Sequence, residues 1–66
     1  MTDPRRAQQL RTAINDLEAT IRGEKGKVAD LRAMGRSDVE STIRNLLLDI
    51  RHNEEQIKQL RIELNA

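Results

Sequence analysis

Few residues of this 66-residue chain are of types that carry out chemistry. His52 is the single histidine, and Asp49 precedes it by three positions, a spacing that places two side chains on one face of a helix. Di-metal sites in helical bundles use Glu at that spacing, together with several further inward carboxylates. The chain has no cysteine, which excludes a thiolate metal site and a disulfide. We therefore expect no bound metal, and we interpret His52 as a solvated surface residue.

The segment Gly23-Glu24-Lys25-Gly26 is the second feature with the residue types of a ligand site. A phosphate-binding loop needs a different glycine spacing and a preceding β-strand, and the sequence shows neither. Catalysis needs a concave site shielded from water, which a helical hairpin does not provide. We therefore expect no enzyme activity, no cofactor and no small-molecule substrate.

Any functional surface must be positioned by two helices. Asp3 and Pro4 favour a helix start, because Asp can cap and Pro at the first helical position loses no needed hydrogen bond. Apolar residues then recur at heptad spacing. They are Ala7, Leu10, Ile14, Leu17, Ile21, Val28 and Leu31. Gly35, which tolerates the left-handed conformation of a helix C-terminus, ends this helix.

A second helix follows almost at once. Ser37 and Glu40 have the spacing of a capping box, with Ser37 at the N-cap. The second apolar seam consists of Val39, Ile43, Leu46, Ile50, Ile57, Leu60 and Leu64. We predict helix 1 over about 4–34, a turn over 35–37 and helix 2 over about 38–64, within a single domain of residues 1–66. So short a connection requires antiparallel helices, and one continuous helix of about 60 residues is the alternative.

Folding the chain back at Gly35 pairs the two seams in one register. The facing residues are Leu10 with Leu64, Ile14 with Leu60, Leu17 with Ile57, Val28 with Leu46, and Leu31 with Ile43, and each pair of residue numbers sums to 74. The predicted fold class is therefore all-α, an antiparallel two-helix hairpin (coiled coil). We expect this hairpin to dimerise into a four-helix bundle, because it buries only one side of each helix.

Two positions of the seam are polar, Glu24 and Asn53, in adjacent layers. Polar seam residues often fix register or oligomeric state, and we favour that interpretation, or simple exposure in a thin core, over a small recognition site. Gly23 and Gly26 lie on the outward side of helix 1, roughly in line with alanines. They mark a close approach by another helix, a hinge or a break in helix 1.

Helix 2 carries more apolar residues than its seam requires. Leu48 and Ile62 lie opposite the seam with Glu55 between them, and Leu47 flanks the seam. We predict a partner interface formed by Leu47, Leu48, Arg51, Glu55 and Ile62, with Gly23 and Gly26 as secondary candidates. The expected partner is a second copy of the chain, with the helix of another protein as the alternative. The predicted function is a non-enzymatic protein–protein interaction or assembly module.

Composition narrows the remaining classes of function. Charged residues make up 35% of the chain, but its formal net charge is only +1 and it has no aromatic residue to stack on bases. Along the sequence, Asp16, Glu18, Glu24 and Asp30 are interleaved with the cations, so binding of RNA or DNA is an alternative that we do not favour. No apolar run is long enough to span a membrane, and we expect a cytoplasmic protein.

One short stretch adds a further alternative partner. Residues Ile21 to Gly26 read Ile-Arg-x-Glu-Lys-Gly, and in length and tight turn the chain resembles the antiparallel coiled-coil fingers that bind Rho-family GTPases. Those fingers usually carry a Glu-Gly-Ala-x-x-Leu pattern. This chain has Gly26-Lys27-Val28-Ala29-Asp30-Leu31 instead. The resemblance implies GTPase binding as an alternative function and carries over no site residues.

Overall fold

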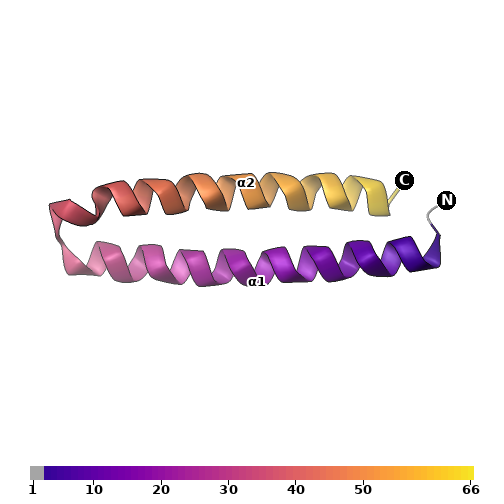
Figure 1. Cartoon of the computed structure of the whole chain (residues 1–66), viewed down its shortest axis with the longest axis horizontal. Coiled ribbons are helices and arrows are strands. Elements are labelled where there is room, and N and C mark those ends of the chain that lie inside the picture. Colours follow the sequence, from indigo (N-terminus) through magenta and orange to yellow (C-terminus); the bar gives the residue numbers. More distant parts are fainter. Residues whose placement is uncertain (1–2) are drawn as a thin grey trace.

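The computed structural model describes residues 3–66 as two long helices joined by a tight turn. Helix α1 spans Pro4–Met34, a single 3₁₀ turn (η1) spans Ser37–Val39, and helix α2 spans Glu40–Leu64. The helices lie side by side and run antiparallel (Figure 1), with Cα extents of 50 × 14 × 11 Å. The hairpin is thus the observed architecture, and the alternative of one continuous helix is wrong.

Both ends of α1 follow the signals in the sequence. Asp3 caps the helix, since its Oδ1 accepts a hydrogen bond of 2.9 Å from the backbone N–H of Arg5. Gly35 adopts the left-handed conformation, with φ 63° and ψ 25°, and its N–H donates to the carbonyl of Arg32. A residue with a Cβ is strained in this conformation, so Gly35 is the residue that allows the chain to reverse here.

The start of α2 differs from the expected capping box. Ser37 opens the 3₁₀ turn rather than the α-helix, and Val39 occupies the N-cap position of α2 without a side-chain hydrogen bond to the helix. A 3₁₀ turn rises about 2.0 Å per residue against 1.5 Å in an α-helix, so it carries the chain further across a very short connection. Asp38 is held by the guanidinium of Arg36, through hydrogen bonds of 3.0 and 2.6 Å.

The core is the predicted aliphatic seam between the helices. Its buried cluster consists of Ile14, Ile21, Val28, Ile50 and Ile57, with Leu17, Ile43, Leu46, Leu60 and Leu64 packed against it. Two ion pairs join the helices, Arg6 with Glu63 and Arg61 with Glu18, both at 2.9 Å. With Ile14 of α1 and Ile50 of α2 at heptad position a, Glu18 and Arg61 occupy e positions, and Arg6 and Glu63 occupy g positions. In an antiparallel coiled coil e positions face each other on one side of the seam and g positions on the other, so the two ion pairs agree with the predicted register.

Candidate interaction surfaces

A buried polar layer interrupts the aliphatic seam near its middle. Glu24 and Asn53 are each only 8% exposed to solvent. The Asn53 Nδ2 donates a hydrogen bond of 3.0 Å to the Glu24 Oε1. The same Nδ2 lies 3.4 Å from the Oδ2 of Asp49, one turn earlier on α2. The two predicted polar seam residues are therefore hydrogen-bonded to each other, as expected of a layer that fixes register. Asp49 is a third member that the sequence did not predict.

The electrostatics of this layer centre on two carboxyl groups. A hydrogen bond with Asp49, burial and the negative charge of Asp49 raise the pKa of the Glu24 carboxyl above its usual 4.5. The hydrogen bond from Asn53 and the positive charge of Lys27 act in the opposite direction on that pKa. The Glu24 carboxyl therefore binds a proton at a higher pH than an isolated glutamate does, so the layer responds to pH.

The outer side of α2 carries large apolar side chains that nothing in the hairpin covers. Leu48 is 59% exposed and Ile62 is 57% exposed. With Glu55 between them, they recur every seven residues on the side of α2 that points away from α1. We call Leu48, Glu55 and Ile62 the outer stripe. Arg51, also predicted for the interface, is exposed one turn from Glu55.

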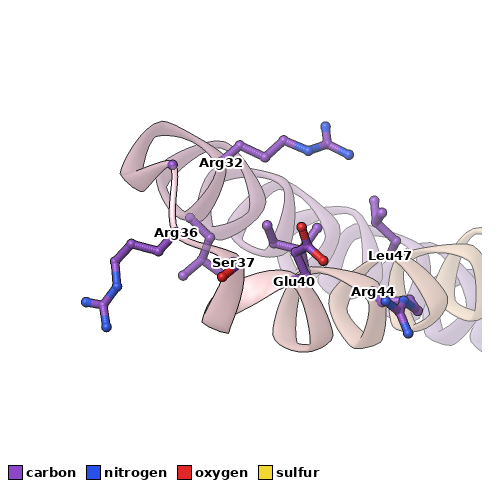
Figure 2. Close-up of a pocket in the computed structure, with 9 residues that line it drawn as sticks. Arg32, Arg36, Ser37, Glu40, Arg44 and Leu47 are labelled. Atoms are coloured by element: carbon purple, nitrogen blue, oxygen red, sulfur yellow. The ribbon is translucent and has the colours of Figure 1, made fainter.

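Leu47, which was predicted for the same interface, flanks the seam as expected and lies apart from the outer stripe. It is 42% exposed and lines an open groove of about 590 Å³ between the helices at the turn end. Figure 2 shows this groove, with Arg32 coming from α1 and Glu40, Arg44 and Leu47 from α2, while Arg36 points away from the hairpin. Leu31 and Ile43 also line it, so the groove is apolar at the seam and charged at its edges.

A second groove continues on the same side of the hairpin. It measures about 300 Å³ and is lined by Glu18, Ile21, Arg22, Glu54, Ile57 and Arg61. Both grooves are lined by heptad positions e and b of the two helices, so they belong to one long face. The residues described contain no group of three His, Cys, Asp or Glu side chains that could hold a metal ion. No helix in residues 3–66 is long and apolar enough to cross a membrane.

The two helical glycines are exposed and sterically unconstrained within the hairpin. Helix α1 passes through Gly23 and Gly26 without interruption, so of the three alternatives for these glycines the helix break is wrong. A Cβ added at either position would meet no atom within 4 Å apart from its chain neighbours and the nearby backbone of its own helix. The hairpin itself therefore does not require glycine at these positions.

This freedom leads to a testable expectation. Gly23→Ala and Gly26→Ala should each stabilise the hairpin by about 1 kcal/mol, because alanine loses less backbone entropy in a helix. Chemical denaturation followed by far-UV circular dichroism measures this gain. A destabilised double variant would contradict it. A stabilised variant that no longer self-associates would show that another helix approaches the glycines closely.

Comparison of the chain with protein-family models, curated proteins and solved structures found no match. No family match therefore supports the resemblance to GTPase-binding fingers. The function of this chain must be argued from its surfaces.

Proposed function

We propose that this chain is a non-enzymatic assembly module, whose hairpins self-associate by packing the outer stripes of two α2 helices against each other. The observation that carries the proposal is the alignment of Leu48 and Ile62, both more than half exposed, on the outward side of one helix. Scattered apolar residues are normal on a surface, but two aligned along a helix form a stripe that another helix can cover.

The surface area of the hairpin supports the same proposal. A compact folded chain of this mass exposes about 4,300 Å². This hairpin exposes 5062 Å², because two helices alone cannot cover each other on more than one side. A typical stable interface buries about 800 Å² per partner. Dimerisation therefore brings the surface of each chain down to that of an ordinary small domain.

The stripe is suited to pairing with itself in an antiparallel arrangement. With a two-fold axis at Glu55, Leu48 of one copy lies opposite Ile62 of the other, and the reverse contact follows by symmetry. Arg51 and Lys58 then flank the Glu55 carboxylate of the opposite copy and offset the repulsion between the two glutamates. The result is a four-helix assembly with both α2 helices at its centre.

Single cysteines test this geometry cleanly, because the natural chain has none. Glu55→Cys places the two sulfurs at the two-fold axis, so mild oxidation should convert most of the protein to a disulfide-linked dimer. Ser41→Cys lies on the same line of α2, but its two copies would be about 42 Å apart in the antiparallel pair. This variant should stay monomeric on a non-reducing gel, as should Asn15→Cys on α1.

Each outcome of the cross-linking experiment is informative. Efficient linkage of both the Glu55→Cys and the Ser41→Cys variants would show that the two α2 helices pair in parallel rather than antiparallel. Absence of linkage in all three variants would contradict pairing through the outer stripe and would leave the stripe for the helix of another protein.

A further inference from the structure

The charges of the hairpin separate into two unlike faces. Along the sequence cations and anions are interleaved, but heptad positions e and b of both helices lie on one side of the seam and positions g and c on the other. The e and b positions hold eight cations, Arg11, Arg22, Lys25, Arg32, Arg44, Arg51, Lys58 and Arg61, against three anions, Glu18, Glu40 and Glu54. We call these residues the basic face.

The opposite face has the reverse balance. Its g and c positions hold two cations, Arg6 and Lys27, and four anions, Asp16, Asp30, Asp49 and Glu63. The ion pair between Glu18 and Arg61 confirms that e positions of both helices share one side, and that between Arg6 and Glu63 confirms the same for g positions. The net charge of the chain is therefore near zero although its two faces have opposite balances of charge.

Most cations of the basic face remain available to a further partner when two hairpins pair, since only Arg51 and Lys58 lie beside Glu55 of the other copy in the proposed dimer. All eight are exposed, and within residues 3–66 only Arg61 among them forms an ion pair. Six of the eight are arginines, whose planar guanidinium groups match phosphate oxygens in bidentate fashion. Arginines gathered on one side of a rigid rod form an electrostatic surface for a polyanion.

The spacing of these cations suits a long and regular ligand. In the register of the hairpin, Arg11 lies level with Arg61, Arg22 with Arg51, and Arg32 with Arg44. From Arg11 to Arg32 the face extends about 32 Å along α1. One turn of a DNA duplex measures about 34–36 Å, so the basic face matches roughly one turn of DNA.

We propose that the basic face binds the phosphate backbone of duplex nucleic acid without reading base sequence. A chain without aromatic side chains has no aromatic ring to stack on unpaired bases, which favours a duplex over a single strand. A membrane surface fits less well, because Leu47 is the one large exposed apolar side chain on this face. The proposal does not depend on self-association through the outer stripe.

Fluorescence anisotropy with labelled 20-base-pair DNA and RNA duplexes tests the proposal. The unaltered chain should bind at low salt, with log K falling against log salt at a slope of about −5, as five or six neutralised phosphates give. Arg22→Gln with Arg44→Gln should weaken binding at least tenfold and reduce the slope by about 2. Both residues lie outside the outer stripe, so the dimer should persist in this variant.

A matched variant controls for net charge. Gln9→Glu with Asn45→Asp lowers the net charge by the same two units at exposed c positions of the opposite face and should change the affinity less than threefold. Equal losses in the two variants, or no binding to either duplex at low salt, would overturn the proposal. Equally tight binding of polyglutamate would overturn it as well, in favour of an acidic protein partner. Tighter binding of either the DNA or the RNA duplex shows which kind of duplex the basic face binds.

Discussion

Replacing Leu48 and Ile62 together by glutamate is expected to weaken self-association about a thousandfold while leaving both helices intact. Each side chain is a little more than half exposed in the hairpin, so covering it contributes roughly 1 kcal/mol. A symmetric pair covers four such side chains, and about 4 kcal/mol corresponds to a factor of about a thousand in the dissociation constant. The new carboxylates add repulsion beside Glu55.

The readouts are light scattering for mass and far-UV circular dichroism for helix content. The control is Asn15→Glu with Ala29→Glu on α1, where two exposed positions the same 14 residues apart receive the same charges. This control should associate like the unaltered chain. If the Leu48 and Ile62 variant associates as well as the control does, the outer stripe is not the interface.

Acidification from neutral pH towards the usual pKa of glutamate is expected to stabilise the hairpin, the reverse of ordinary acid denaturation. The folded chain holds a proton at Glu24 at pH values where the unfolded chain has released it, since the pKa of the Glu24 carboxyl is raised above 4.5 by Asp49 and by burial. Unfolding above pH 4.5 therefore releases a proton, and stability falls as the pH rises through the raised pKa. Thermal melts across this pH range measure the effect.

Three variants separate the contributions to this layer. Glu24→Gln should raise the melting temperature at pH 7 and flatten its dependence on pH, because an amide keeps hydrogen bonds to Asn53 and Asp49 without the second negative charge. Asn53→Ala should cost about 2 kcal/mol at pH 7 by removing a buried donor from two carboxyl groups. Glu54→Gln removes an exposed carboxylate elsewhere on α2 and should leave the pH dependence unchanged. A Glu24→Gln variant with the original pH dependence would contradict the raised pKa of the Glu24 carboxyl.

The sequence predicted the architecture well because heptad spacing determines which residues meet. The seam, the reversal at Gly35 and the cap at Asp3 each follow from one local signal, and no other part of the fold competes with them. The start of α2 was predicted less well, because Ser37 and Glu40 have capping-box spacing while the geometry of the short turn determines the winding there.

The polar layer and the charged faces could be predicted only in part. Glu24 and Asn53 were visible as exceptions in the seam, but Asp49 lies beside the seam and reaches the layer through the orientation of its side chain, which heptad spacing does not specify. The basic face was hidden because neighbours in sequence point to different sides of a helix. Grouping the charges by heptad position, rather than by sequence order, is the signal that reveals it.

Sedimentation equilibrium of the unaltered chain over a concentration series tests the central claim most directly. Interference optics are needed, because the chain has no Trp or Tyr. The account predicts a mass of twice 7.6 kDa that persists to low micromolar concentration. A mass of 7.6 kDa throughout the series would contradict self-association through the outer stripe.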